Sequence, residues 1–346
     1  MEPQKTIGVL TGGGDCPGLN AAIRAVVRKG TALGYRVLGF RNGWAGVLNA
    51  DYQELDANAV TGILSVGGTV LGTSRTNPLK SPQDKRRLLE NFAVVDALVA
   101  IGGDDTLGVA GHLANMDLPV VGIPKTMDND VAGTDYTIGF DSAVETVANC
   151  LDMLHTTAAS HHRVMVVEVM GRDAGWVALI GGLTGGADYI LIPEVPTDVQ
   201  TVAAHLRERR EARNKDSSIV VVSEGAEIEG LETREAIVGS GDQFGHARLD
   251  TRALGHTLGQ ALERLTGYET RATVLGHLQR GGSPTVYDRL MATRLVVAAV
   301  EYLHEGRTGV MAAVRGNQIA AVPLTEVIGE NRKVDLDLYE MAKVFF

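Results

Sequence analysis

Short apolar runs alternate with longer amphipathic segments along most of the chain. Several runs are β-branched and bounded by glycine or proline, which is the pattern of strands that are buried on both faces of a parallel sheet. The predicted strands are Thr6–Leu10, Val94–Ile101, Pro119–Ile123, Val164–Val169, Tyr189–Ile192, Ile219–Ser223 and Ala272–Leu275. The predicted helices between them include Leu19–Leu33, Leu107–Asn115, Ser142–Thr157, Val199–Arg213 and Leu254–Leu265.

This alternation predicts an α/β protein with mainly parallel sheets. A chain of 346 residues is long for one core, so we expect two domains. Glycine makes up 42 of the 346 residues, about 12% against roughly 7% in an average protein, and much of it follows particular predicted strands. This uneven placement favours two doubly wound domains, and a closed α/β barrel is the alternative.

Composition and charge exclude several classes of partner. The net charge is −10, and the basic runs Lys85–Arg87 and Arg207–Arg213 have acidic residues among or beside them, so we expect no nucleic acid partner and interpret both runs as solvated helix faces. No apolar run is long enough for a membrane span, and the N-terminal residues lack the features of a secretory signal. The two cysteines, Cys16 and Cys150, form no metal-binding spacing, so we expect a cytoplasmic protein. Cys16 is a loop filler or, alternatively, a nucleophile.

Polar motifs follow six of the predicted strands at their carboxyl ends. In open α/β sheets, ligands bind beyond this end of the strands, so these loops are expected to carry the chemistry. In chain order they contain TGGGDCPGLN (residues 11–20), GGDDT (102–106), PKTMDND (124–130), MGRDAGW (170–176), EGAEIEG (224–230) and GHLQRGGSP (276–284).

The first two loops have the composition of an anion-binding site. Three glycines in TGGGDCPGLN allow main-chain N–H groups to approach a phosphate, and the next helix adds its positive N-terminus; a tight turn is the alternative. In GGDDT, a carboxylate needs a cation to contact phosphate. We therefore expect Asp104 to bind Mg²⁺ together with substrate oxygens and water. A helix N-cap is the alternative for Asp104 and Asp105.

The third loop places Asp128 and Asp130 two residues apart, beside a lysine and a threonine. Phosphoryl transfer needs a carboxylate that accepts the proton of the attacking hydroxyl, a second that holds metal, and a cation. An ordinary surface turn is the alternative. Five basic residues at or close to later strand ends together indicate an anionic substrate, although each alone could be a salt-bridge partner. They are Arg163, Arg172, Arg271, His277 and Arg280.

Taken in order, these motifs resemble the phosphofructokinase family over essentially the whole chain. The matching segments are TGGGDCPGLNAAIRAVVR, GGDDT, PKTMDND followed by GTDYTIGFDSA, VVEVMGRDAGW, SEG and ETRATVLGHLQRGGSP. The resemblance implies two doubly wound α/β domains with the active site between them. It also implies a homo-oligomer, either dimer or tetramer, and Mg²⁺ as cofactor.

The resemblance further implies a role for each matching residue. Asp128 would accept the proton of the 1-hydroxyl of fructose 6-phosphate, with Thr126 and Asp130 beside it. Asp104 would bind Mg²⁺, and Arg172 would balance charge on the transferring phosphoryl group. Residues of the donor site would be Gly12, Gly13, Arg75, Asp105, Thr106 and Lys125. Residues of the sugar-phosphate site would be Thr126, Asp128, Arg163, Met170, Gly171, Arg172, Glu224, Arg271, His277 and Arg280, with Arg163 and Arg271 supplied by a neighbouring subunit.

Two positions resemble the pyrophosphate-dependent branch of the family. Asp105 and Lys125 stand where the common bacterial ATP-dependent pattern has glycines. A carboxylate at position 105 would crowd and repel the α-phosphate of a nucleotide, and Lys125 would fill part of the nucleotide space and pair with pyrophosphate. We expect reversible transfer from pyrophosphate to fructose 6-phosphate, giving fructose 1,6-bisphosphate and phosphate. An ATP-dependent enzyme is the alternative.

The expected domains are each built from two chain segments. We expect residues 1–140 and about 252–305 to form a donor-binding domain, and about 141–251 and 306–346 to form a sugar-phosphate-binding domain. Two functions from other classes are alternatives. A nicotinamide-dependent dehydrogenase would need G-x-G-x-x-G in the first loop, which is absent. A non-catalytic sugar-phosphate-binding subunit would not need the three carboxylates at positions 104, 128 and 130.

Overall fold

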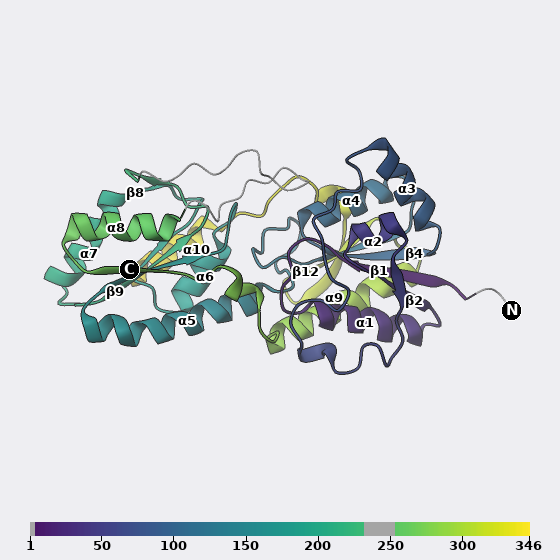
Figure 1. Cartoon of the computed structure of the whole chain (residues 1–346), viewed down its shortest axis with the longest axis horizontal. Helices are drawn as coiled ribbons and strands as arrows, with labels where there is room; N and C mark the ends of the chain where they lie inside the picture. The colour runs from purple at the N-terminus through teal and green to yellow at the C-terminus, as the bar shows by residue number, and fades with distance from the viewer. Residues whose placement is uncertain (1–3, 232–252) are drawn as a thin grey trace. The chain divides into compact units, whose positions relative to one another are not determined.

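Each of two structural units is organised around its own mainly parallel sheet (Figure 1). The computed structural model describes residues 4–231 and 253–346. Within these ranges, unit 1 comprises residues 4–142 and 280–331, and unit 2 comprises the rest.

Unit 1 contains a seven-stranded sheet in the order β13-β12-β5-β4-β1-β2-β3. All neighbours are parallel except β2 with β3 and β12 with β13. Its elements are β1 (Thr6–Thr11), α1 (Leu19–Ala32), β2 (Arg36–Phe40), α2 (Trp44–Asn49), β3 (Tyr52–Glu54), η1 (Ile63–Ser65), α3 (Pro82–Phe92), β4 (Ala97–Gly102), α4 (Asp104–Ala114), β5 (Val120–Pro124), α9 (Val286–His304), β12 (Val310–Arg315), β13 (Gln318–Pro323) and η3 (Leu324–Glu326).

Helices cover both faces of this sheet, as Figure 1 shows. Every residue of β1, β4 and β5 is buried, which explains their continuous apolar sequences. On one face, Leu10 and Leu98 belong to a core shared with α2, α3 and α4. Helices α1 and α9 lie on the other. The chain proceeds from β1 to β2 on one side and later to β4 on the other, so β1 and β4 form a topological switch point, where ligands of such sheets bind.

Unit 2 contains a four-stranded parallel sheet, β11-β6-β9-β7, and a short parallel pair, β8 with β10. Its elements are β6 (Val164–Val169), α6 (Trp176–Thr184), β7 (Tyr189–Leu191), β8 (Thr197–Asp198), α7 (Val199–Glu211), β9 (Ser218–Ser223), β10 (Ile228–Glu229), α8 (Leu254–Thr266), β11 (Thr270–Val274), α10 (Leu336–Ala342) and η4 (Lys343–Phe345). Helix α5 (Phe140–His161) and η2 (Gly276–Arg280) cross the division between the units. Helices α7 and α8 share a core with alternate residues of β6 and β9, among them Val166 and Val220.

The prediction of α/β units with mainly parallel sheets is confirmed, but two domain assignments were wrong. Residues 253–279 belong to unit 2 because β11 pairs with β6 and α8 packs on the same sheet. Residues 306–331 belong to unit 1 because β12 pairs with β5, and β13 pairs with β12. The first division lies between Ser142 and Ala143, two residues beyond the expected one. Residues 232–252, predicted to belong to the sugar-phosphate-binding domain, lie outside the described residues.

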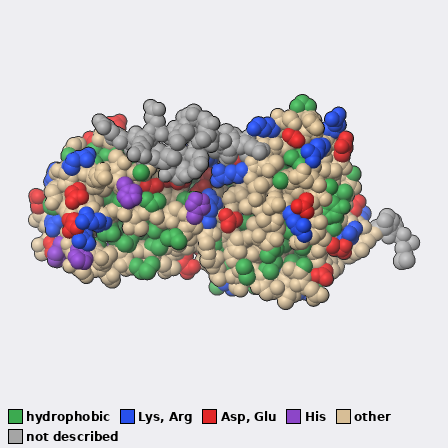
Figure 2. Space-filling view, in the orientation of Figure 1, with side chains coloured by type: hydrophobic (Ala, Val, Ile, Leu, Met, Phe, Trp, Pro, Cys, Tyr) green, Lys and Arg blue, Asp and Glu red, His purple; other side chains and the backbone are tan. Residues whose placement is uncertain are grey.

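The charge distribution on the surface and the apolar length of the helices bear on whether the partner is a nucleic acid or a membrane. On the face drawn in Figure 2, acidic and basic side chains are interspersed over the described part of the chain. One arginine of the predicted solvated run on α7 is instead buried, since Arg209 is 9% exposed and pairs with Asp188 at 2.5 Å. Among the described residues, no helix is both long and apolar enough to cross a bilayer.

Candidate active site

The loops after β1, β4 and β5 are joined by main-chain hydrogen bonds at one edge of the unit 1 sheet. Gly12 N–H donates to the Ile101 oxygen at 2.9 Å, and Lys125 N–H donates to the Gly102 oxygen at 3.0 Å. Since these strands are adjacent and parallel, the polar residues that follow them are held in one region. The three motifs predicted to form the donor site are therefore brought together.

The glycine loop after β1 is required by close packing. A Cβ atom on Gly12 would lie 2.4 Å from Thr106 Oγ1, and Gly13 has φ of +79°. Gly13 N–H donates to the Ser74 oxygen at 3.2 Å, and Gly12 N–H is bonded to β4. Both N–H groups thus have main-chain partners in this structure, and the assignment of Gly12 and Gly13 to the donor site stays a prediction. The absence of a side chain on Gly12 allows the loop to pack directly against Thr106, which is buried.

Asp104 and Asp105 lie in the first turn of α4, after the N-cap residue Gly103. The N-cap alternative is thus wrong for both, although the helix dipole favours negative charge at this position. Both aspartates line a pocket of about 380 Å³ along the exposed side of α4. The pocket is lined by Asn77, Leu79, Asp104, Asp105, Gly108, Val109, His112, Asn115 and Ile328. Burial and the charge of Lys85 lower the pKa of His112.

Lys125 lies under the glycine loop. Its side chain is 2% exposed, and its ammonium group donates to the Gly14 oxygen at 2.5 Å. Burial lowers the pKa of Lys125, because a charged amine loses hydration there. This lysine therefore connects the loops after β1 and β5, and places a cation directly beneath the predicted donor loop.

The loop that carries Asp128 and Asp130 is shaped by the residue between them. Asn129 has φ of +53° and is 3% exposed, and its Oδ1 accepts from Thr137 N–H at 3.0 Å. Thr137 also donates through Oγ1 to the Thr126 oxygen at 2.5 Å. This turn is held by buried hydrogen bonds, unlike the surface-turn alternative, and the two flanking aspartates are half-buried.

A buried carboxylate that the motifs did not single out fixes the next segment. Asp288 is fully buried and accepts from Gly139 N–H at 2.7 Å, Ser142 N–H at 2.9 Å and Tyr136 O–H at 2.8 Å. Thr285 caps α9 by accepting from Asp288 N–H at 3.1 Å. The T-x-x-D spacing at 285–288 is a sequence signal for this helix start, but its link to residues 136–142 depends on the fold.

Of two predicted arginines, Arg280 contacts the glycine loop, and Arg75 follows a residue that is hydrogen-bonded to it. Arg280 donates through Nη1 to the Asp15 oxygen at 3.1 Å, and a Cβ atom on Gly14 would lie 2.4 Å from the same nitrogen. Arg280 was predicted to bind sugar phosphate, and in unit 1 it borders the loop predicted for the donor. Arg75 is exposed and follows Ser74, which is hydrogen-bonded to Gly13.

In unit 2, the predicted substrate residues follow three neighbouring strands. Met170, Gly171 and Arg172 follow β6, Glu224 follows β9, and His277 follows β11. Gly171 has φ of +131°, and its oxygen accepts from Ser223 Oγ at 2.5 Å. Arg172 Nε donates to Asp173 at 2.9 Å. The parallel order β11-β6-β9 brings these loops to one edge of the sheet.

Arg163 and Arg271 lie at the opposite edge of that sheet. Arg163 precedes β6, and Arg271 is the second residue of β11. Both guanidinium groups contact Glu269, at 2.8 Å and 2.5 Å, and these contacts lower the pKa of that carboxyl. The structure therefore brings these two arginines together but separates them, within unit 2, from the edge that carries Met170.

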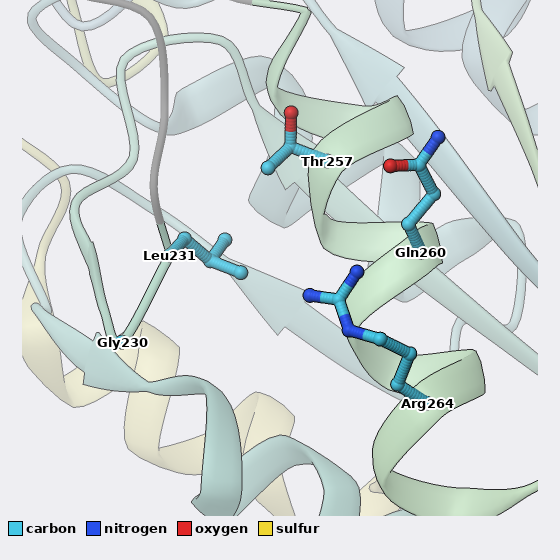
Figure 3. Close-up of a pocket in the computed structure, with 5 residues that line it drawn as sticks. All are labelled: Gly230, Leu231, Thr257, Gln260 and Arg264. Carbon is cyan, nitrogen blue, oxygen red and sulfur yellow. The ribbon is translucent and has the colours of Figure 1, made fainter.

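A second pocket, of about 490 Å³, lies in unit 2 between α8 and the chain that follows β10 (Figure 3). Thr257, Gln260 and Arg264 point into it from one side of α8, and Gly230 and Leu231 line the other side. None of these residues is among the predicted site residues. Its larger volume does not make it the candidate site, because the motifs that can carry phosphoryl transfer lie elsewhere.

Comparison with known proteins gives the family of the chain. The sequence matches the phosphofructokinase family over residues 6–303. It is 52% identical over 347 residues to a pyrophosphate–fructose 6-phosphate 1-phosphotransferase of Streptomyces coelicolor, covering 98% of this chain and 99% of that protein. It is 47% identical over 345 residues to ATP-dependent 6-phosphofructokinase 2 of the same organism, covering 98% and 99%.

The fold is also similar to that of a solved structure. The phosphofructokinase of Saccharomyces cerevisiae superposes with a TM-score of 0.80 at 33% sequence identity, over 94% of this chain. The match covers 45% of the yeast chain, so this protein spans less than half the length of that relative. The order of the motifs, the parallel sheets that carry them and the match over residues 6–303 agree, and the chain belongs to the phosphofructokinase family.

Proposed function

We propose that this protein transfers a phosphoryl group from pyrophosphate to the 1-hydroxyl of fructose 6-phosphate, giving fructose 1,6-bisphosphate and phosphate. The observation that carries the choice of donor is the pair formed by Asp105, in the first turn of α4, and Lys125, buried under the glycine loop. One phosphoryl group of pyrophosphate is transferred to the sugar oxygen and the other leaves as inorganic phosphate. With so small a leaving group, the reaction would be close to reversible.

The position of Asp105 argues against a nucleotide donor. Asp105 lines the pocket along α4, and we propose that this is the space an extended donor would enter. A like charge placed against a nucleotide phosphate costs several kcal/mol, on the order expected for juxtaposed like charges. Pyrophosphate is shorter and would avoid this repulsion, while Lys125 would supply a positive charge from below the loop.

The names of relatives alone do not decide the donor. The pyrophosphate-dependent relative of Streptomyces coelicolor is 52% identical and an ATP-dependent one from the same organism is 47% identical. This difference is small, so the ATP-dependent reaction is the second candidate. The residues at positions 105 and 125 favour pyrophosphate because they add charge and bulk where a nucleotide needs space.

We propose that Asp128 is the general base. It follows β5 on the turn buttressed by Asn129, so its carboxylate is held by a rigid main chain. It would accept the proton of the sugar hydroxyl as the oxygen attacks the phosphorus. Thr126 and Asp130 would orient this exchange, and Arg172 of unit 2 would balance the charge of the transferring phosphoryl group.

The sugar phosphate would be bound by the loops at the carboxyl edge of the unit 2 sheet. Met170 and Gly171 offer main-chain groups, Glu224 suits the sugar hydroxyls, and His277 suits the phosphate. Arg280 would complete the phosphate contacts. These five residues come from loops after three adjacent strands, which is the arrangement expected for binding a ligand at a sheet edge.

Asp104 would hold Mg²⁺. No cluster of three or more His, Cys, Asp or Glu side chains able to hold a metal ion is found among residues 4–231 and 253–346. A Mg²⁺ site that uses one or two carboxylates together with substrate phosphate oxygens and water fits this limited donor set. When bound, the ion would neutralise part of the negative charge on the donor phosphates.

Arg163 and Arg271 would act on the sugar phosphate of a neighbouring subunit. Arg163 and Met170 lie at opposite ends of β6, separated by about 20 Å of extended chain. One sugar phosphate cannot contact both ends, so the arginines would serve a second copy of the chain in a homo-oligomer.

The two cysteines are both free, which suits a cytoplasmic enzyme.

A forward assay tests this proposal. Fructose 6-phosphate would be supplied with pyrophosphate or with ATP at equal Mg²⁺, and kcat/KM would be measured for each donor. We expect kcat/KM to be higher with pyrophosphate. A preference for ATP would overturn the choice of donor, and an absence of turnover with either would overturn the proposed reaction.

A further inference from the structure

A buried amide joins two of the loops that we assign to the sugar phosphate. Gln279 lies in η2 and is fully buried. Its Oε1 accepts from Met170 N–H at 3.2 Å, and its Nε2 donates to the Gly276 oxygen at 3.1 Å. The loop after β6, which contains Met170, and the turn that contains His277 are thus connected through one side chain.

Only an uncharged group that both accepts and donates can make these two bonds. The Met170 contact needs an acceptor and the Gly276 contact needs a donor, and an amide supplies one of each. Gln279 itself is fully buried, and its two hydrogen bonds are partly buried. Loss of the amide would remove the partners of the Met170 N–H and of the Gly276 oxygen.

The other side of the Met170 loop is fixed independently. Ser223 Oγ donates to the Gly171 oxygen at 2.5 Å, and Gly225 N–H donates to the same oxygen at 3.0 Å. These contacts come from the end of β9, whereas Gln279 approaches from the end of β11. The Met170 N–H is therefore held by Gln279, whereas the Gly171 oxygen is held from β9.

We propose that Gln279 is a positioning residue for the sugar phosphate, which it serves by setting the Met170 main chain and the His277 turn relative to each other. The inference rests on the proposed function, because that function assigns Met170 and His277 to the sugar phosphate. Gln279 itself touches no reacting atom, so its replacement should weaken sugar-phosphate binding more than it alters the use of the donor.

Two substitutions separate the two hydrogen bonds. Gln279→Met keeps an unbranched chain of similar size but removes both bonds. Gln279→Glu keeps the shape and, when ionised, loses the donor and faces the Gly276 oxygen with a negative charge. At neutral pH we expect both variants to weaken fructose 6-phosphate binding by roughly tenfold or more, the scale expected when a partly buried hydrogen bond is lost. The KM for pyrophosphate should change less than twofold.

Acidification tests the role of the bond pattern itself. Burial raises the pKa of a glutamic acid, and its protonated form can accept from Met170 while donating to Gly276. The affinity of Gln279→Glu, divided by that of the wild type at the same pH, should therefore recover as pH falls. Gln279→Met should not recover. The ratio to wild type removes the titration of the ligand and of the ionisable groups that both proteins share.

Calorimetric titration with fructose 6-phosphate alone is the main measurement, since it needs no donor. Gln260→Glu, the same change on the exposed side of α8, is the matched control and should bind like wild type. If the wild type does not bind fructose 6-phosphate, the proposed function fails. If the wild type binds and Gln279→Met binds equally well, this inference is overturned. The inference would also be overturned if the variants bound both substrates equally more weakly and the affinity of Gln279→Glu did not recover at low pH. That result would indicate a merely structural role.

Discussion

The ammonium group of Lys125 donates a 2.5 Å hydrogen bond to the main-chain oxygen of Gly14, beneath the loop that we assign to the phosphoryl donor. The lysine is almost completely buried, so the charge is kept there at the expense of its hydration. A bound anion above the loop would offset part of this cost. The residue that adds positive charge for pyrophosphate is thus also a structural link between β1 and β5.

Lys125 should give the folding stability a specific pH dependence. Burial lowers its pKa below the ordinary value of 10.5, so between the lowered value and 10.5 the unfolded chain binds more protons than the folded one. The free energy of unfolding therefore rises with pH across this window. Urea unfolding from about pH 7 to about pH 10 measures the free energy of unfolding of the wild type and of Lys125→Met. We expect the wild-type value minus the Lys125→Met value to increase with pH. A difference independent of pH would contradict a lowered pKa.

The two neighbouring aspartates of α4 should behave differently when their charge is removed. Asp105→Asn and Asp105→Gly remove the charge proposed to repel a nucleotide, so we expect lower kcat/KM with pyrophosphate and a gain with ATP. Asp104→Asn is the matched control, because loss of the proposed Mg²⁺ ligand should lower kcat/KM with either donor. Unchanged pyrophosphate kinetics in both Asp105 variants would refute the proposed role of this residue.

Helices and strands could be predicted from the sequence where a run of buried residues or a glycine-rich turn defines them. The strand Val164–Val169 and the start of α1 at Leu19 agree with the structure because a β-branched run and a glycine-rich turn define them locally. The antiparallel pair β12 with β13 was not predicted. Each strand contains an alanine pair, which has low strand propensity, and these strands are explained only by the pairing of β12 with β5 and of β13 with β12.

The site was predictable as a set of motifs, but its supports were not. Asp104, Asp128 and Met170 each follow a strand, so a rule about sheet edges finds them. Asp288 and Gln279 act through partners more than 100 residues away in sequence, such as Gly139 and Met170. No local pattern encodes such a pairing. The same holds for the domain limits, since strand pairing decides which unit β11 and β12 join.

Asp288 should contribute strongly to folding stability, because several hydrogen-bond donors depend on its carboxylate. Asp288→Asn places an amide N–H group against main-chain N–H groups of Gly139 or Ser142, and we expect it to lower the free energy of unfolding by about 3 kcal/mol. Tyr136→Phe removes one donor and should cost about 1 kcal/mol. Urea unfolding of both variants and of the double variant measures the coupling. An Asp288→Asn effect no larger than that of Tyr136→Phe would contradict the network.

Asp128 should affect turnover more than binding. If it accepts the hydroxyl proton, Asp128→Ala should lower kcat by roughly 10² or more, the scale of general-base catalysis. The KM for fructose 6-phosphate should change much less, because other residues hold the sugar phosphate. Asp152→Ala, on the exposed side of α5, is the control for loss of a carboxylate. A kcat within a few-fold of wild type would exclude Asp128 as the base.

Mixed oligomers test whether Arg163 serves a neighbouring subunit. Arg163→Ala and Asp128→Ala should each be nearly inactive alone. In a hybrid dimer, the subunit with intact Asp128 can receive Arg163 from its partner, which forms one complete site, while the other site carries both changes. Random mixing should therefore restore about a quarter of wild-type activity in dimers. If Arg163 acted within its own subunit, every site would contain one defect and mixing would restore nothing. Activity measured after co-refolding the two variants, against each variant refolded alone, distinguishes the two cases.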